Sequence, residues 1–117
     1  MDPKPIKLVS ILTKNPALSF QEFQDYYENK HCKTIKLIPG VQRYFRRYLQ
    51  TLPGGTVPFS EEPVFTAMAE LWFNSREDLE FALRRSADPE IANILVPDEK
   101  FLFDREKMRI YTVDERF

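Results

Sequence analysis

The stretch SFQEFQDYYENKHCKTIKLIPG, residues 19–40, decides the fold, because it predicts one helix with both of its ends marked. Ser19 and Glu22 have the spacing of a capping box, and Pro39–Gly40 is a pair that ends a helix. Between these ends, apolar side chains and the only histidine of the chain recur at steps of three and four, the spacing of one helix face. That face carries Phe20, Phe23, Tyr27, His31, Ile35 and Ile38. The sequence therefore places an imidazole among aromatic and aliphatic side chains.

Four other segments have the composition of β-strands. They are rich in β-branched or aromatic residues, and turn residues separate them from their neighbours. The segments are IKLVSILT (residues 6–13), VQRYFRRYLQT (41–51), VFTAMAELWF (64–73) and MRIYTVDE (108–115). Between the second and the third lies LPGGTVPFSEEP (52–63), which predicts a long loop that we interpret as a lid over a site.

Two more helices are expected in the second half of the chain. A second capping pattern at residues 75–78 begins a helix that REDLEFALRR (76–85) continues with one apolar face. An Asp-Pro pair begins a short third helix over residues 88–95. We expect the next segment, VPDEKFLFDREK (96–107), to be irregular apart from one helical turn.

The order of elements is β-α-β-β-α-β, which is the ferredoxin-like arrangement of the α+β class. We expect residues 1–117 to form a single domain of this kind. Two helices cover only one face of a four-stranded sheet, and the predicted strands carry apolar residues on both faces. Because soluble monomers avoid large exposed apolar patches, we expect the open face to be covered by a second copy in a homodimer.

Composition excludes several classes of partner. The net charge is −1, so the chain has no general basic field for nucleic acid or for an anionic membrane. Basic and aromatic residues alternate in RYFRRY (43–48), as they do in sites for single-stranded nucleic acid. A β-strand with one solvent-exposed face has the same pattern. The single cysteine, the absence of a long apolar run and the absence of a signal-peptide pattern favour a cytoplasmic location. We therefore expect no nucleic-acid or membrane partner.

With these elements in place, the chain resembles a known family. FQEFQDYYENKHCKTIKLIPGVQRY (20–44) is similar to the signature of EthD-type proteins, in which an aromatic pair and a histidine on a helix precede a Pro-Gly turn and a tyrosine-bearing strand. AELWFNS (69–75) and PDEKFLFD (97–104) are similar to later landmarks of that family. One departure is HCK (31–33), where the family often has a small residue and a proline after the histidine. This departure concerns the local helix geometry more than the family.

The resemblance implies a dimeric α+β barrel in which two ferredoxin-like sheets face each other. Relatives with this architecture include cofactor-free polyketide cyclases, dehydratases, decarboxylases, small monooxygenases and isomerases. We therefore expect a cofactor-independent lyase- or cyclase-type enzyme of secondary metabolism, acting by proton transfer on a small aromatic or polyketide-like intermediate. The alternatives are a cofactor-free monooxygenase of a small phenolic substrate and a non-catalytic carrier of a hydrophobic metabolite.

His31 and Tyr27 are the candidate catalytic residues. An imidazole can take and give a proton near neutral pH, as dehydration, decarboxylation and cyclisation require. Tyr27 lies one turn before it on the same face and can hold a substrate oxygen. The alternative is that His31 is a core histidine satisfied by a carbonyl or a buried carboxylate.

The candidate substrate-binding residues come from the second and third strands. Arginine suits a carboxylate or an enolate oxygen, tyrosine a phenolic or ketone oxygen, and a carboxylate inside an apolar barrel tends to have a raised pKa. The structural alternatives to substrate binding are ion pairs among these charged groups and ordinary packing of the tyrosines. The candidates are Arg43, Tyr44, Arg46, Tyr48, Glu70 and Trp72.

Other residues have structural interpretations. We expect Cys32 to be structural, because adjacent helix residues such as His31 and Cys32 do not face each other. Tyr26 should face away from Tyr27, toward a subunit boundary. Asp104 is a weaker candidate near the mouth of a pocket. One histidine and one cysteine, without metal-ligand spacing, predict no metal site, although related barrels can bind haem through a histidine.

Overall fold

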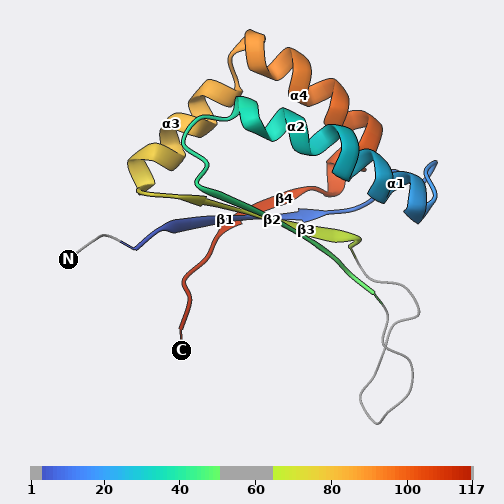
Figure 1. Ribbon diagram of the computed structural model, residues 1–117, viewed down its shortest axis with the longest axis horizontal. Helices are drawn as coiled ribbons and strands as arrows, with labels where there is room; N and C mark the ends of the chain where they lie inside the picture. The colour runs from blue at the N-terminus through green and yellow to red at the C-terminus, as the bar shows by residue number, and fades with distance from the viewer. Residues whose placement is uncertain (1–3, 51–64, 117) are drawn as a thin grey trace.

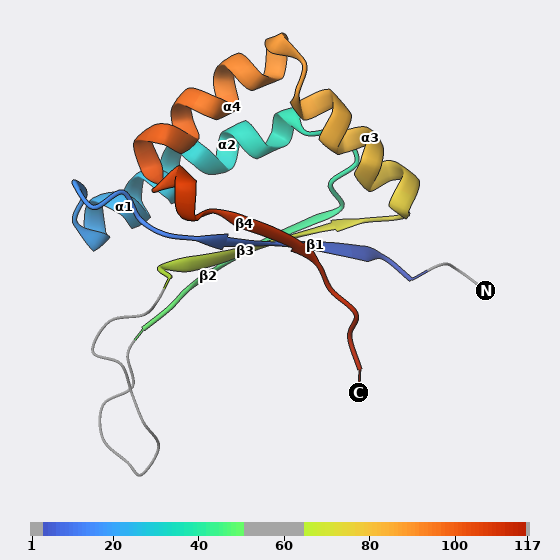
Figure 2. The ribbon, with the colours of Figure 1, turned by 180° about the vertical axis from the view of Figure 1, so that it is seen from behind.

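The structure, a computed structural model, describes residues 4–50 and 65–116 as an α+β fold with one antiparallel sheet. The strands lie in the order β2-β3-β1-β4, and the helices cover one face of the sheet, as Figures 1 and 2 show from opposite sides. The strands are β1 (Ile6–Leu12), β2 (Arg43–Tyr48), β3 (Ala67–Phe73) and β4 (Arg109–Thr112). This is the ferredoxin-like arrangement, so the fold expected from the order of elements is confirmed.

The register of the sheet determines which side chains face the helices. Leu8 of β1 pairs with Leu71 of β3 and with Thr112 of β4, and Leu71 in turn pairs with Tyr44 of β2. Burial alternates along β3, where every second residue from Ala67 is buried and those between are half-exposed. Because successive side chains of a strand point to opposite faces, one set packs under the helices and the other lies on the open face.

The predicted first helix is a continuous helical segment with a wide turn in its middle. Its capping box is confirmed: Ser19 accepts a hydrogen bond from the Glu22 amide, and the Glu22 carboxylate accepts one from the Ser19 amide. In the wide turn, the Cys32 amide donates to the Tyr27 carbonyl, five residues earlier, as in a π-helix. After the segment, Gly40 has a φ of +84°, which glycine adopts at little cost. The parts are α1 (Phe20–Tyr26), η1 (Tyr27–His31), α2 (Cys32–Thr34) and η2 (Ile35–Leu37).

The second half of the chain forms two helices, α3 (Arg76–Ser86) and α4 (Pro89–Leu102). The cap of α3 is confirmed, because the Ser75 hydroxyl accepts a hydrogen bond from the Asp78 amide. The expected end of the third helix at residue 95 is wrong, since α4 continues through Pro97 to Leu102. A 3₁₀ turn, η3 (Arg105–Lys107), then leads into β4.

Packing explains why α4 continues past its proline. Ile91, Leu95 and Leu102 are buried on one face of the helix, and burying such a side chain contributes about 1.5–3 kcal/mol. Together these contributions exceed the cost of one interior proline, about 3 kcal/mol. The expected strands 41–51 and 108–115 are longer than the observed β2 and β4. The expected loop at 52–63 lies outside the described residues.

The core lies between the helices and the sheet. Phe23 and Tyr27 from the first helical segment, Phe73 from β3 and Leu102 from α4 are its largest fully buried side chains. His31 is buried with them and is the only polar or charged residue in the described part of the chain that is buried to this degree. No described helix is long and apolar enough to cross a membrane.

Candidate functional site

A cavity of about 150 Å³ lies between the helices and the helix-covered face of the sheet. Its walls are mostly aliphatic and aromatic. They come from the helix-facing side of all four strands, from the first helical segment and from α3 and α4. Three of the residues predicted for a site line it, namely Tyr27, His31 and Tyr44. The apolar lining includes Leu8, Leu12, Ile35, Ile38, Ala69, Leu71, Leu83, Leu95, Phe103, Met108 and Ile110.

His31 is held at the wall of this cavity by a carboxylate. Its Nδ1 lies 2.5 Å from Oδ2 of Asp98 on α4, and both side chains are nearly excluded from solvent. The rings of Tyr27 and Phe103 pack edge-on against the imidazole, at centroid distances of 5.2 and 5.3 Å. Because an ionised carboxylate only accepts hydrogen bonds, Nδ1 carries the proton and the lone pair resides on Nε2. Nε2 is therefore the nitrogen that can act on a molecule in the cavity.

Sequence reasoning missed Asp98, because it lies in the segment expected to be irregular. A signal was present, since Ile91, Leu95, Asp98 and Leu102 follow one another at helical spacings. An acidic residue in such an apolar series needs a buried partner. The only histidine of the chain is that partner.

Asp98 has a second partner in Tyr26, whose hydroxyl donates a hydrogen bond to Oδ1. This hydrogen bond to a carboxylate, together with burial, raises the pKa of Tyr26 to about 12. The phenol therefore keeps its proton at neutral pH and remains a donor. The structure places Tyr26 against α4, whereas the sequence suggested a subunit boundary.

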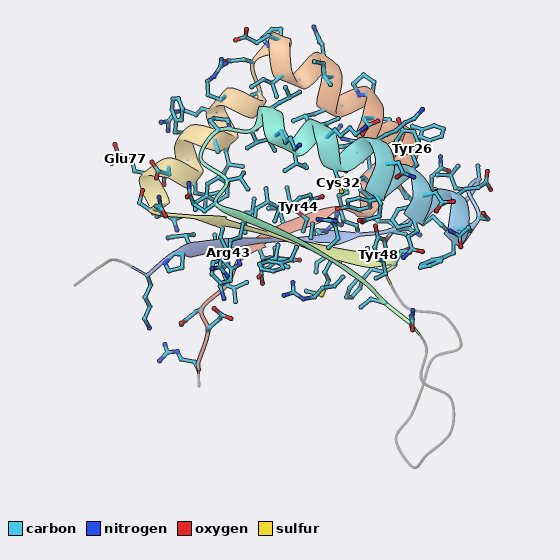
Figure 3. The ribbon with its side chains drawn as sticks, viewed as in Figure 1. Tyr26, Cys32, Arg43, Tyr44, Tyr48 and Glu77 are labelled. Atoms are coloured by element: carbon cyan, nitrogen blue, oxygen red, sulfur yellow. The ribbon has the colours of Figure 1, made fainter. Side chains whose placement is uncertain are left out.

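Tyr27 and Tyr44 form a pair of hydroxyls at the cavity. The Tyr44 hydroxyl donates to that of Tyr27 across 3.0 Å, and burial raises the pKa of both phenols. Since Tyr27 accepts this bond, its own proton is free to be donated to a substrate oxygen. Figure 3 shows Tyr44 on the side of the sheet that faces the helices.

Arg46 and Tyr48 point to the helical side of β2 but bind Glu28 instead of lining the cavity. Two guanidinium nitrogens of Arg46 lie 3.0 and 2.6 Å from the Glu28 carboxylate oxygens, and the Tyr48 hydroxyl donates to the same carboxylate across 2.6 Å. The hydrogen bonds from Arg46 and Tyr48 hold the pKa of Glu28 below its ordinary value of 4.5. An arginine from β2 is thus not brought to the imidazole, because its charge is already compensated.

The remaining predicted residues lie on the open face, with the sheet between them and the cavity. The Trp72 indole donates to Glu70 across 2.7 Å, and the Arg43 guanidinium lies 4.9 Å from the centre of the indole ring. Arg47 lies 3.6 Å from Glu70, so the ion-pair alternative is the one observed. Figure 3 shows Arg43 and Tyr44 on opposite sides of β2. The alternation of a strand therefore divides the candidates into two groups that cannot share one pocket.

The weaker candidate Asp104, and Cys32, which was expected to be structural, do not line the cavity. Asp104 pairs with Lys107 at 3.8 Å in a surface groove beside η3. Cys32 is half-buried, and burial raises the pKa of its thiol, which makes it a poor nucleophile. Within residues 4–50 and 65–116, no three His, Cys, Asp or Glu side chains are grouped as metal ligands.

The comparisons with known proteins agree with this architecture. The EthD domain matches residues 15–106, a span that contains the histidine, its carboxylate and the three tyrosines around them. The chain belongs to the EthD domain family. The resemblance seen in the sequence is thereby confirmed. A comparison with curated proteins gave no significant match.

Solved structures similar to this EthD chain share its fold at low identity. An ethyl tert-butyl ether d (EthD) family protein from Bacillus halodurans is 22% identical, with a TM-score of 0.68 over 97% of this chain and 100% of the other. A DABB family protein with a ferredoxin-like fold from Mesorhizobium loti is 10% identical, with a TM-score of 0.63 over 97% and 98%. A dimeric ferredoxin-like protein from Thermobifida fusca is 9% identical, with a TM-score of 0.60 over 93% and 89%.

Proposed function

We propose that this EthD-domain protein is a cofactor-independent enzyme of the lyase or cyclase type, which moves a proton on a small aromatic or polyketide-like intermediate. The observation that carries the proposal is the 2.5 Å contact between His31 Nδ1 and Asp98 at the wall of an apolar cavity. A carboxylate that fixes the tautomer of an imidazole and stabilises its protonated form is the arrangement of a general base. A core histidine satisfied by a carboxylate would need no adjoining cavity.

The proton transfer uses two of the cavity-lining residues. Nε2 of His31 takes a proton from a carbon next to a carbonyl group. The electron pair of the broken C–H bond forms the C=C bond, and the π pair of the C=O bond moves to the oxygen, which gives an enolate. Tyr27 donates its hydroxyl proton in a hydrogen bond to that oxygen. The imidazolium is paired with Asp98 until it returns the proton to carbon or to a leaving group. Dehydration, decarboxylation and cyclisation all include such a step.

The cavity supports a small, mostly apolar substrate. Its lining is dominated by aliphatic and aromatic side chains, and Tyr27, Tyr44 and His31 supply hydrogen-bonding groups to it. The lining also includes Ser10, Ser86 and Glu99, and the Glu99 carboxylate is paired with Arg105. Such a surface binds a ring by burial and orients it with a few hydrogen bonds. Among the described residues that line the cavity there is no arginine to bind a carboxylate, so an enolate oxygen is better matched here than an acid group.

The test is hydrogen–deuterium exchange at the carbon next to the carbonyl of 1-tetralone, a small aryl ketone that exchanges slowly without a catalyst. We expect the protein to accelerate incorporation of deuterium from D₂O, measured by NMR, and His31→Gln to abolish the acceleration. Cys32→Ser, at the next residue, should keep it, because Cys32 does not line this cavity. Circular dichroism and thermal unfolding confirm that both variants are folded.

The same experiment separates the alternative functions. A carrier would bind 1-tetralone, seen as changes in amide NMR shifts, without accelerating exchange, and His31→Gln would alter binding little. A cofactor-free monooxygenase would consume oxygen with an electron-rich phenol such as a dihydroxynaphthalene. Either result would overturn the proton-transfer proposal.

We also propose that two copies associate through the open face of the sheet. This face carries aromatic and aliphatic side chains from all four strands, including Phe45, Trp72 and Tyr111, and the helices leave it uncovered (Figure 2). Burying such a surface against itself would give the symmetric contact of a dimer. The similar protein from Thermobifida fusca is described as dimeric, which supports the proposal.

A further inference from the structure

Two residues of one helical segment contact the same carboxylate. Tyr26, the last residue of α1, donates to Oδ1 of Asp98, and His31, the last residue of η1, contacts Oδ2. They are five residues apart along the chain. Asp98 lies on α4, 67 residues after His31.

The wide turn of η1 makes this double contact possible. On a regular α-helix, five residues cover ~500°, about 140° more than one turn, so side chains at this spacing diverge. In η1 the Cys32 amide bonds to the Tyr27 carbonyl, five residues earlier, and each residue then covers a smaller angle. Positions five apart move onto more nearly the same side of the helix, and Tyr26 and His31 both reach α4.

We propose that Tyr26 is a positioning residue, which fixes the Asp98 carboxylate so that its second oxygen holds the Nδ1–H tautomer of His31. The proposal rests on the proton-transfer function inferred above. Neither Tyr26 nor Asp98 is among the residues that line the cavity, so both act through the imidazole. Tyr26, Asp98 and His31 thus form a chain of two hydrogen bonds that ends at the imidazole.

The surroundings of Tyr26 show that its ring is itself fixed. Its centroid lies 4.6 Å from that of Phe101 on α4, and the ammonium of Lys30, four residues later in the same helical segment, lies 5.6 Å from the ring. A rigid donor restricts the rotation of a carboxylate more than a mobile one would. A bond that only joined the two helices would not need an acceptor already shared with the imidazole.

Removal of the Tyr26 hydroxyl should therefore change the tautomer of the His31 imidazole. In Tyr26→Phe, Oδ1 of Asp98 loses its donor and the carboxylate can rotate, so Nδ1–H is held less firmly and the Nε2–H tautomer gains population. We expect the deuterium exchange of 1-tetralone to slow about tenfold, the scale of loss when a partner that orients a functional side chain is removed. The matched control is Tyr48→Phe, because the Tyr48 hydroxyl donates to a different carboxylate, that of Glu28, and Tyr48 does not line the cavity.

The deciding measurement is the ¹⁵N and ¹H NMR spectrum of His31, which is unambiguous because the chain has one histidine. In the wild type and in Tyr48→Phe we expect a downfield Nδ1–H proton protected from exchange with water. In Tyr26→Phe we expect this signal to be lost and the ¹⁵N shifts to report a mixture of tautomers. In the Asp98→Asn background, Tyr26→Phe should have no further effect on exchange of 1-tetralone or on the tautomer, because its action passes through the carboxylate.

The outcomes distinguish this proposal from the proposed function. If Tyr26→Phe lowers thermal stability but leaves the Nδ1–H signal and the exchange rate unchanged, Tyr26 only joins the helices and the positioning role is overturned. The same conclusion follows if its effect persists undiminished in Asp98→Asn. If the wild type does not exchange 1-tetralone but Tyr26→Phe still removes the Nδ1–H signal, the positioning of His31 stands and the proton-transfer function falls.

Discussion

The hydroxyl of Tyr44 on β2 donates a hydrogen bond of 3.0 Å to the hydroxyl of Tyr27 in η1, beneath the only histidine of the chain. This bond determines which way the Tyr27 hydroxyl donates its own proton. Because one lone pair of Tyr27 is engaged from the sheet side, its own proton is left for an acceptor in the cavity. Burial raises the pKa of both phenols, so neither loses its proton at neutral pH.

We expect Tyr44→Phe to slow the exchange of 1-tetralone about three- to tenfold, since an unassisted Tyr27 is a weaker and less oriented donor. The loss of one buried hydrogen bond should also lower the free energy of unfolding by about 1–2 kcal/mol. Tyr48→Phe is the control, because Tyr48 binds Glu28 and does not line the cavity. Equal exchange rates in the two variants would show that the hydroxyl pair has no part in the chemistry.

Asp98→Asn should slow exchange about 100-fold while keeping the fold. An asparagine of the same shape can present its amide nitrogen to Nδ1, which would favour the tautomer with the proton on Nε2 and remove the base. Rates of deuterium incorporation test this, with thermal unfolding measured in parallel. A variant with wild-type rates would show that the carboxylate only satisfies a core histidine.

The pH dependence of the free energy of unfolding should show the stabilising contribution of the ionised Glu28 carboxylate. Its pKa is lowered in the folded protein from an ordinary value of 4.5, because Arg46 and Tyr48 donate to its charged form. A lowered folded pKa means that the stabilisation is present above pH 4.5 and is lost as the pH falls through the folded value. We expect Glu28→Gln to be destabilising at pH 7, and we expect its difference from the wild type to shrink as the pH falls below 4.5, as measured by urea unfolding. The difference at pH 7 should be modest, since the pair is partly exposed.

A charge on the open face should separate the proposed dimer. We expect Phe45→Glu to convert the protein to a monomer in sedimentation equilibrium, because a carboxylate would be buried at the contact without a partner. Phe81→Glu on α3 is the matched control, since Phe81 is 48% exposed on the helical side of the molecule. If both variants have the mass of the wild type, the open face is not the contact.

The proline inside α4 provides a further test of how Asp98 is held. Pro97→Ala restores an amide that can bond to the carbonyl of residue 93, and we expect it to raise the free energy of unfolding by about 1–2 kcal/mol. Pro89→Ala, at the first turn of the same helix, should change stability much less, because the amide at that position has no partner within the helix. Chemical denaturation measures both. A loss of stability in Pro97→Ala would indicate that the proline is needed to seat Asp98 against His31.

The sequence by itself determined the local elements. The capping box at Ser19 and the cap at Ser75 are present as expected, since side-chain-to-backbone hydrogen bonds over three residues depend only on local spacing. The order of strands and helices, and the burial of Tyr27 and His31 on one helix face, follow from periodicity. These features were readable because the geometry of the backbone repeats.

Tertiary structure decided the site. The meeting of His31 with Asp98 spans 67 residues and depends on α4 packing over the first helical segment. The sharing of that carboxylate with Tyr26 depends on the wide turn of η1, which no periodic pattern in the sequence predicts. The β2 and β3 candidates were divided between two faces by the sheet, and only its register and the covering helices determine which face adjoins the imidazole. Local geometry thus gives each residue a face, whereas the packing of distant elements determines which faces meet.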